Sequence, residues 1–354
     1  MSVVIAIAHY PHVNFYKHAI KQLRNMGIEI KLVVQPRGNL VSIVERELGA
    51  EFTSMGKYQQ NILKKFFDMA TCDIKMANYL LKNGGDVNTG VGSIVLTHAS
   101  FLLRKPSIIF EDDIEYKLAY YPYKYFATYV VMPDCIPSRG KNILKYKGFK
   151  ELAYLHPNRF SPRGDVLKEY GLQPNGYVFI REVSGTTKNY SGLKEGFLIN
   201  ICSDIIKLGY QIILSLENKN LYDLFQRYCT ILKEPVSDIH SLMHYAAFTI
   251  ASGDSMSRES CLLGTPAIYT GGRKMSINAE LERRKCLFTC NSDKKQIMNI
   301  INYIRNHNIK KYTTQIINQA IFNEWEDTTD VIINCLLAAL NKDDTLIEKY
   351  KMRN

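Results

Sequence analysis

The feature that most constrains this chain is an alternation of short β-branched runs with helical patterns, which occurs twice. Strands predicted over residues 3–8 and 29–34 flank a helix predicted over 13–26. Such a βαβ unit has a right-handed crossover and therefore parallel strands. The alternation continues to a strand at 129–132 and restarts with one at 177–181. Between them, residues 133–162 contain four prolines and two glycines, which predicts a linker or domain boundary.

The length of 354 residues exceeds what a single hydrophobic core usually supports. We therefore expect an α/β protein with two facing Rossmann-like domains, residues 1–160 and 161–325, and a helical tail over 326–354. In open parallel sheets ligands bind outside the carboxyl ends of the strands. A cleft between the domains is the expected place for the chemistry.

The chain has 45 Lys and Arg against 34 Asp and Glu, a formal net charge of +11. This excess favours a polyanionic partner such as a diphosphate, an anionic lipid surface or nucleic acid. No dense basic run or recognised module supports nucleic acid, so we expect no nucleic-acid partner. No apolar run is long enough to cross a membrane, so membrane contact would be peripheral.

The eight cysteines are scattered among apolar stretches, a usage typical of a reduced, cytoplasmic compartment. Cys286 and Cys290 form the one close pair in the sequence, with no second pair at ligand spacing. We therefore expect no metal site.

Residues 251–266 predict a strand, a turn of small residues and a helix that opens with hydroxyl side chains. Unpaired backbone N–H groups and the positive end of the helix dipole suit a phosphate, and Gly253 allows close approach. Glu259, one turn into the helix, can accept hydrogen bonds from ribose hydroxyls. The alternative is an ordinary N-cap by Ser252 or Asp254, with Glu259 solvated. Both interpretations stay open.

A second polar segment follows the predicted strand at 177–181. Arg181 ends the strand, and Ser184, Gly185 and Thr186 follow in a loop that resembles an anion cradle, because the planar guanidinium suits a diphosphate. An ordinary polar loop is the alternative.

Two segments of the first half carry titratable groups at predicted strand ends. His9 and His12 follow the first strand, where a histidine is a candidate general base. Residues 111–113 place three carboxylates after the strand at 106–110, where they could bind an acceptor, act as a base or ligate a metal. The alternative is a helix N-terminus stabilised by acids. Residues 116–129 combine tyrosines and phenylalanines with lysines, a composition that fits either a membrane-interface face or core packing.

Five segments, taken in order, resemble an uncharacterised prokaryotic family of GT-B-like proteins. They are Pro-His-Val-Asn-Phe-Tyr-Lys at 11–17, Met-Gly-Lys-Tyr at 55–58, Phe-Glu-Asp at 110–112, Tyr-Lys-Gly-Phe-Lys-Glu-Leu-Ala-Tyr-Leu-His-Pro at 146–157, and Gly-Asp-Ser-Met-Ser-Arg-Glu at 253–259. The family is related to nucleotide-sugar glycosyltransferases and to UDP-N-acetylglucosamine 2-epimerases. Its usual pattern has a second glycine where this chain has Asp254, a carboxylate that would repel a diphosphate if it faced the site.

The resemblance implies a GT-B-like fold and a nucleotide-sugar donor, with a UDP-sugar as the expected one. It implies that Glu259 holds the ribose and that His12 is the acceptor base. A carboxylate of residues 111–113, with Asp112 as the candidate, is the alternative base. The diphosphate would lie between two groups of residues: Ser252, Gly253, Asp254, Ser255 and Met256 on one side, and Arg181, Ser184, Gly185 and Thr186 on the other.

The implied activity is a glycosyltransferase without a bound metal or cofactor, because helix termini and arginine stabilise the leaving diphosphate. It would transfer a sugar to a hydroxyl of a glycan or lipid-linked acceptor, in surface polysaccharide or glycoconjugate biosynthesis. The charge would then favour peripheral contact with an anionic membrane at its cytoplasmic face.

Two other functions remain as alternatives. A nucleotide-sugar 2-epimerase shares the fold, but those enzymes carry a histidine-rich motif after the first strand of the second domain, and here residues 181–184 contain no histidine. A non-enzymatic protein that binds a nucleotide sugar or a nucleic acid is the other alternative.

Overall fold

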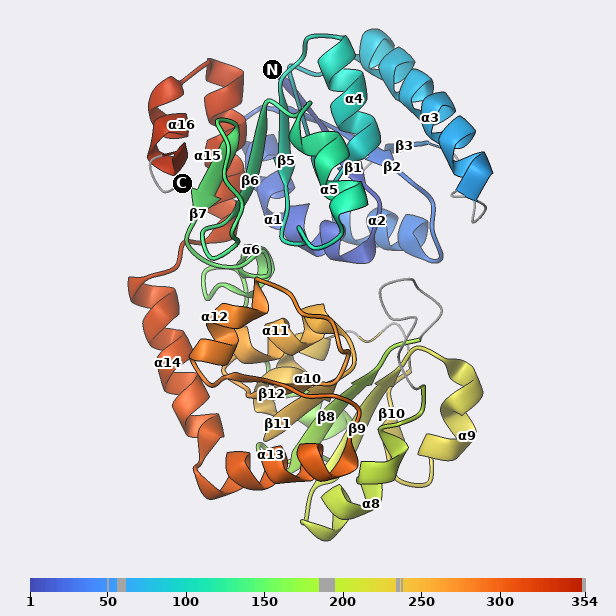
Figure 1. Cartoon of the computed structure of the whole chain (residues 1–354), viewed down its shortest axis with the longest axis vertical. Coiled ribbons are helices and arrows are strands. Elements are labelled where there is room, and N and C mark those ends of the chain that lie inside the picture. Colours follow the sequence, from blue (N-terminus) through green and yellow to red (C-terminus); the bar gives the residue numbers. More distant parts are fainter. Residues whose placement is uncertain (50, 56–61, 185–194, 234–235, 237, 352–354) are drawn as a thin grey trace. The chain divides into compact units, whose positions relative to one another are not determined.

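A computed structural model describes residues 1–354 except 50, 56–61, 185–194, 234–235, 237 and 352–354. Two compact units divide the chain: Met1–Arg159 with Trp325–Asn354 form the first, and Phe160–Glu324 form the second. Figure 1 shows each unit as a sheet with helices packed around it. The chain's last helices thus belong to the first unit, although the second unit precedes them in sequence.

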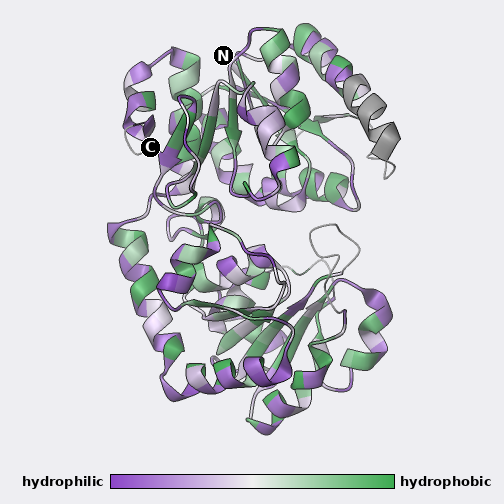
Figure 2. Cartoon of the chain, in the orientation of Figure 1, coloured by the Kyte–Doolittle hydropathy of each residue, from purple (hydrophilic) through white to green (hydrophobic). Residues whose placement is uncertain are grey.

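The first unit is built on a parallel sheet with the strand order β3-β2-β1-β4-β5-β6-β7. Most of its strands are buried and apolar, as expected for a sheet covered on both faces, whereas the edge strand β3 is partly exposed. Figure 2 shows the hydrophobic strands of this sheet. The strands are β1 (Ser2–Ile7), β2 (Glu29–Val34), β3 (Phe52–Ser54), β4 (Val87–Val91), β5 (Ser107–Phe110), β6 (Tyr129–Pro133) and β7 (Ile143–Tyr146).

The helices of the first unit cover both faces, because right-handed crossovers that proceed from β1 toward β3 and from β4 toward β7 place their helices on opposite sides. Helices α3 (Ile62–Asn83), α4 (Ile94–Leu102) and α5 (Lys117–Lys124) adjoin one another. On the other side α1 packs against α2, α6 and α15. These are α1 (Tyr10–Asn25), α2 (Leu40–Leu48), α6 (Leu152–Leu155), α15 (Thr328–Asn341) and the final α16 (Asp344–Lys351).

The proline- and glycine-containing stretch at 133–162 was predicted to be a linker or a domain boundary. The first unit passes to the second within it, between Arg159 and Phe160, but most of the stretch is folded as part of the first unit. Ile143–Tyr146 form strand β7, paired in parallel with β6, and all four residues are buried. The strand is short and contains Lys145, a residue depleted from strands. Its ammonium group is satisfied by the carbonyl oxygens of Pro133 and Ile136, an arrangement that only the tertiary structure provides.

The second unit repeats the doubly wound plan, with the strand order β10-β9-β8-β11-β12-β13. The strands are β8 (Tyr177–Glu182), β9 (Gln211–Leu216), β10 (Thr230–Ile231), β11 (Phe248–Ala251), β12 (Ala267–Tyr269) and β13 (Leu287–Thr289). The helices are α7 (Val166–Glu169), α8 (Ile199–Lys207), α9 (Tyr222–Phe225), α10 (Ile239–Tyr245), α11 (Asp254–Leu262), α12 (Asn278–Arg283), α13 (Lys294–Asn306) and α14 (Ile309–Asn323), with a 3-10 turn at Lys219–Leu221.

Both sheets reverse their strand order beside the first strand, at β1/β4 and at β8/β11. At such switch points the connections on either side diverge and leave a crevice at the carboxyl ends of the strands. The α/β class with two Rossmann-like domains and C-terminal helices is confirmed. The two switch points are therefore the places where a ligand site is expected.

Candidate functional site

The first candidate cluster lies at the carboxyl ends of β1 and β5. It consists of His12, Glu111, Asp112 and Lys150, and is called the first-unit cluster below. His12 was expected in a loop but lies in the first turn of α1. The helix begins at Tyr10 because Pro11 suits a first-turn position, where its missing N–H costs nothing.

His12 is held by its surroundings and is almost completely buried, at 8% exposure. The Ala8 N–H donates to Nδ1 at 3.4 Å, and the ring meets that of His9 edge-on at 5.3 Å between centroids. Burial lowers the pKa of His12 well below its usual value, with His9 and Lys150 acting in the same direction and Asp112 opposing them. The imidazole is therefore neutral near pH 7, the state that a general base requires.

Asp112 forms a buried ion pair with Lys150. The Nζ atom lies 2.8 Å from Oδ1, and the two side chains are 13% and 5% exposed. Sequence reasoning missed Lys150 because the residue falls in the stretch interpreted as a linker. The only signal was its place within the family-like block at 146–157.

Glu111 organises the loop rather than facing solvent. Its Oε1 accepts hydrogen bonds from the N–H groups of Asp112 and Asp113 at 2.9 and 2.8 Å, and its Oε2 accepts one from the Tyr123 hydroxyl. Burial, and then the charge of Asp112, raise the pKa of Glu111 to about 7. The alternative of acids at a helix N-terminus was wrong for this segment, since α5 begins at Lys117 with no acid in its first turn.

The second candidate cluster lies where β11 runs into α11. It consists of Gly253, Asp254, Glu259, His240 and Arg273, and is called the second-unit cluster below. Gly253 is the N-cap of α11 and makes no side-chain cap. A Cβ on Gly253 would lie 3.0 Å from the Val183 side chain, so any larger residue at this position would have to displace Val183.

Ser252 ties the two strands at the switch point together. Its hydroxyl accepts from the Val183 N–H at 2.8 Å and donates to the Arg181 carbonyl oxygen at 3.3 Å. The side chain is fully buried and does not cap α11. Ser255 and Met256 follow in the first turn and are half-buried.

Asp254 is neutralised by an arginine that sequence reasoning missed. Arg273 Nη1 lies 2.9 Å from Asp254 Oδ2, and Oδ1 accepts from the Ser255 N–H at 2.9 Å. Arg273 belongs to the loop after β12. The backbone of this loop lies close to that of Ser252, because a Cβ on Gly271 would be 2.3 Å from the Ser252 carbonyl oxygen. The repulsion that Asp254 would exert on a diphosphate is therefore offset within the unit.

Glu259 lies one turn further along α11 and is 7% exposed. His240 Nε2 approaches Glu259 Oε2 to 3.6 Å, and the His240 ring meets Phe160 edge-on at 5.9 Å. The solvated alternative for Glu259 was wrong, because α10 and α11 pack together. A buried carboxylate with a histidine beside it suits recognition of hydroxyl groups.

Arg181 and Ser184 face carboxylates of their own unit. The guanidinium donates to Ser215 at 2.8 Å and to Glu217 at 3.4 Å. The Ser184 N–H donates to Glu217 at 3.1 Å. Gly185 and Thr186, predicted for the same cradle, lie outside the described residues, so the cradle stays a prediction.

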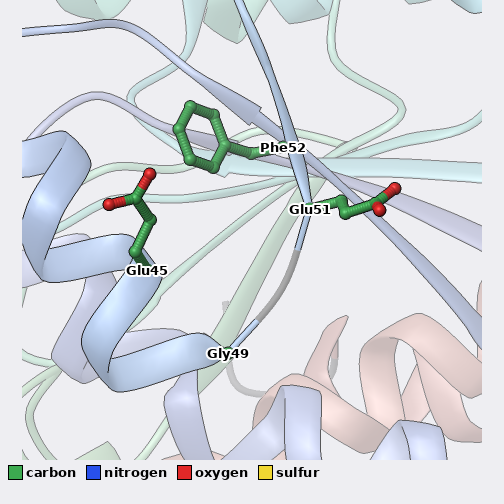
Figure 3. Close-up of a pocket in the computed structure, with 4 residues that line it drawn as sticks. All are labelled: Glu45, Gly49, Glu51 and Phe52. Atoms are coloured by element: carbon green, nitrogen blue, oxygen red, sulfur yellow. The ribbon is translucent and has the colours of Figure 1, made fainter.

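A separate pocket of about 520 Å³ opens beside α2 and β3, lined by Glu45, Gly49, Glu51 and Phe52 (Figure 3). Two carboxylates flank one phenyl ring there, and none of the predicted site residues is among them. This lining does not suit an anionic nucleotide.

No helix within the described part of the chain is long and apolar enough to span a bilayer. The same residues contain no group of three or more His, Cys, Asp or Glu side chains placed to hold a metal ion.

A family profile described as "Protein of unknown function (DUF354)" matches residues 1–341. The chain belongs to this family. A relative, the uncharacterised protein MJ0665 of Methanocaldococcus jannaschii, is 22% identical to this DUF354 chain, with 94% of this chain and 96% of the relative covered. The resemblance seen in the sequence motifs is thus confirmed.

Solved structures with the same fold include proteins in complex with UDP or UDP-GlcNAc. S. aureus MnaA, in a UDP co-structure, superposes with a TM-score of 0.74 at 10% identity, covering 96% of the DUF354 chain and 97% of its own. The UDP-GlcNAc 2-epimerase of M. jannaschii, in complex with UDP-GlcNAc and UDP, gives 0.69 at 14% identity, covering 91% and 100%.

The glycotransferase of kitacinnamycin gives a TM-score of 0.65 at 10% identity, covering 96% of the DUF354 chain and 99% of its own. At these identities the similarity shows the fold alone. The GT-B-like class predicted from the resemblance is confirmed, and both epimerases and a glycosyltransferase share it.

Proposed function

We propose that this protein is a glycosyltransferase that moves a sugar from a UDP-sugar to an acceptor hydroxyl without a bound metal. The observation that carries the proposal is the ion pair of Arg273 with Asp254 at the start of α11. Arg273 offsets the Asp254 carboxylate at the glycine-led start of α11, so the positive end of the helix dipole would stabilise the charge that develops on the leaving diphosphate. Glu259 and His240 would then receive the ribose hydroxyls.

The first-unit cluster would supply the proton acceptor. The acceptor O–H gives its proton to His12 Nε2 while its oxygen attacks C1 of the sugar, and the bond from C1 to the diphosphate oxygen breaks. Asp112, whose charge opposes the lowering of the His12 pKa, stabilises the imidazolium that forms. The contact from the Ala8 N–H to Nδ1 corresponds to the neutral tautomer with its proton on Nε2. Because that contact is long, at 3.4 Å, the ring can take the other tautomer, with the proton on Nδ1 and the lone pair on Nε2, before it accepts the proton.

The test is a binding and turnover series with nucleoside diphosphates and their sugars. We expect UDP and a UDP-sugar to raise the melting temperature of the full chain more than ADP or GDP does, since a ligand of the folded state stabilises it. We also expect UDP release from that sugar in the presence of an acceptor, unchanged by EDTA. No stabilisation by any nucleoside diphosphate would contradict the proposal.

Product analysis by NMR separates this function from 2-epimerisation. An epimerase converts the nucleotide sugar to its C2 epimer without an acceptor, whereas a transferase leaves C2 unchanged and releases UDP. Residues 181–193 contain no histidine, which favours transfer over epimerisation in this chain.

A further inference from the structure

Exposed apolar side chains of the first unit gather on two adjacent helices and the segments that follow them. They form what is called the aromatic patch below: Phe101, Leu102, Leu118, Tyr121, Tyr125 and Phe126. Leu118 is 79% exposed, Tyr125 is 70% and Leu102 is 69%. Single exposed apolar residues are ordinary, but a contiguous group marks an interaction surface.

The aromatic patch is one surface rather than scattered side chains. Helices α4 and α5 contact each other and lie side by side in Figure 1. The ring of Phe101, at the end of α4, meets that of Phe126, after α5, at 5.0 Å between centroids. The ring of Tyr121, on α5, stacks on that of Tyr125, the residue after this helix, at 6.0 Å between centroids. The rings therefore bridge the two helices.

The charges around the aromatic patch are positive where they reach solvent. Within residues 101–126, the charged residues Arg104 and Lys117 are exposed, and the carboxylates of that stretch are buried or half-buried. Lys124 extends along the tyrosines, with Nζ 5.3 Å from the centre of the Tyr120 ring. Such a lysine covers apolar surface with its stem and keeps its charge at the edge.

We propose that the aromatic patch docks this protein on the surface of a bilayer that contains anionic lipid. Tyrosine has an apolar ring and a polar hydroxyl and suits the boundary between acyl chains and headgroups. Lysine and arginine at the rim suit anionic headgroups. A second copy of this basic surface would be repelled, so the charge favours lipid over self-association.

Helix α5 connects the aromatic patch to the first-unit cluster. Tyr123, on the buried side of α5, donates a hydrogen bond to Glu111, while Leu118 and Tyr121 on the same helix face outward. Docking would thus hold the proposed acceptor end at the membrane and favour a lipid-linked acceptor. That consequence rests on the proposed function, whereas the docking itself does not.

The test is co-sedimentation of the full chain with vesicles of phosphatidylcholine alone or with phosphatidylglycerol, at low and high salt. We expect binding only to the vesicles with phosphatidylglycerol and its loss at high salt. The double variant Leu118→Ser with Tyr125→Ser should weaken the partitioning about tenfold or more. Lys117→Gln should weaken it about fivefold.

The matched control is Tyr222→Ser with Leu224→Ser on α9, two residues that are 46% and 53% exposed in the second unit. It should bind vesicles like the wild type. Absence of binding, equal binding to neutral vesicles, or wild-type binding by the Leu118→Ser, Tyr125→Ser variant would overturn the inference. UDP binding is measured on the same variants and should not change, so a failure of docking is distinct from a failure of the proposed function.

Discussion

The two candidate clusters are built in different ways, although both lie at the carboxyl ends of parallel strands. The second-unit cluster is mostly local: Gly253, Asp254 and Glu259 occupy one strand–turn–helix segment. The first-unit cluster joins residues far apart in sequence, since Lys150 reaches Asp112 at 2.8 Å across 38 positions.

This difference affects how charge is treated at each cluster. In the second unit the carboxylate of Asp254 at the helix start is balanced by Arg273 from a neighbouring loop, so the positive end of the α11 dipole can act on a diphosphate. In the first unit burial keeps His12 neutral near pH 7 and raises the pKa of Glu111 to about 7, while Asp112 is paired with Lys150. The second-unit cluster therefore suits anion binding, and the first-unit cluster suits proton transfer.

The variant His12→Gln gives the largest expected effect and tests whether the first-unit cluster carries out proton transfer. Glutamine can donate a hydrogen bond but cannot take the proton, so we expect turnover to fall about a thousandfold while UDP affinity stays unchanged. UDP release and calorimetric titration measure the two quantities. If turnover were retained, His12 would act only as a hydrogen-bond donor through its Nε2–H group and not as the base.

A control variant and a pH profile of the wild type accompany His12→Gln. His307→Gln changes an exposed histidine of the second unit and should leave turnover unchanged. In the wild type the pKa of His12 lies well below 6.5, so kcat/KM should show no acid-side fall from His12 between about pH 6 and pH 8.

Replacing Lys150 with methionine should affect stability most. It leaves the Asp112 carboxylate buried without its partner, which lowers the free energy of unfolding by about 3 kcal/mol. Urea denaturation measures the loss, and adding Asp112→Asn should recover part of it. Lys147→Met, at an exposed position nearby, is the matched control; an equal effect of both variants would contradict the ion pair's role.

Glu111 predicts a pH dependence of stability. Its pKa rises from 4.5 to about 7 on folding, so its contribution is fully present below about pH 4.5 and is lost as pH rises through about 7, by about 3 kcal/mol at most. Glu111→Gln should remove this slope in urea titrations. Glu182, whose pKa burial also raises to about 7, allows the same test in the second unit. A wild-type slope in Glu111→Gln would show that other groups cause it.

Arg273→Gln should produce the smallest of these changes, in binding. Loss of the cation leaves Asp254 uncompensated at the helix start, and we expect UDP affinity to fall about 10- to 30-fold. The further change Asp254→Asn should restore part of the affinity. Arg283→Gln removes an exposed pair with Glu280 and should change affinity little. Unaltered UDP binding by Arg273→Gln would place the diphosphate elsewhere.

Local patterns predicted the parts of this protein that depend on neighbouring residues. Hydrophobic periodicity and the positions of glycine and proline identified the βαβ units and the strand–turn–helix segment at 251–263, because both signals depend on residues only a few positions apart. Strand β7 was missed because a buried lysine breaks its pattern, and α1 was predicted to begin too late, because Pro11 was interpreted as part of a loop.

The sequence by itself determined the two-domain α/β plan, the family and the order of the motifs, since these follow from periodicity and from residues that lie together in the chain. The tertiary structure alone decided which charges are paired. Lys150 meets Asp112, Arg273 meets Asp254, and His240 approaches Glu259 across separate elements. Electrostatic pairing and burial depend on distance in space, and spacing along the chain does not encode that distance.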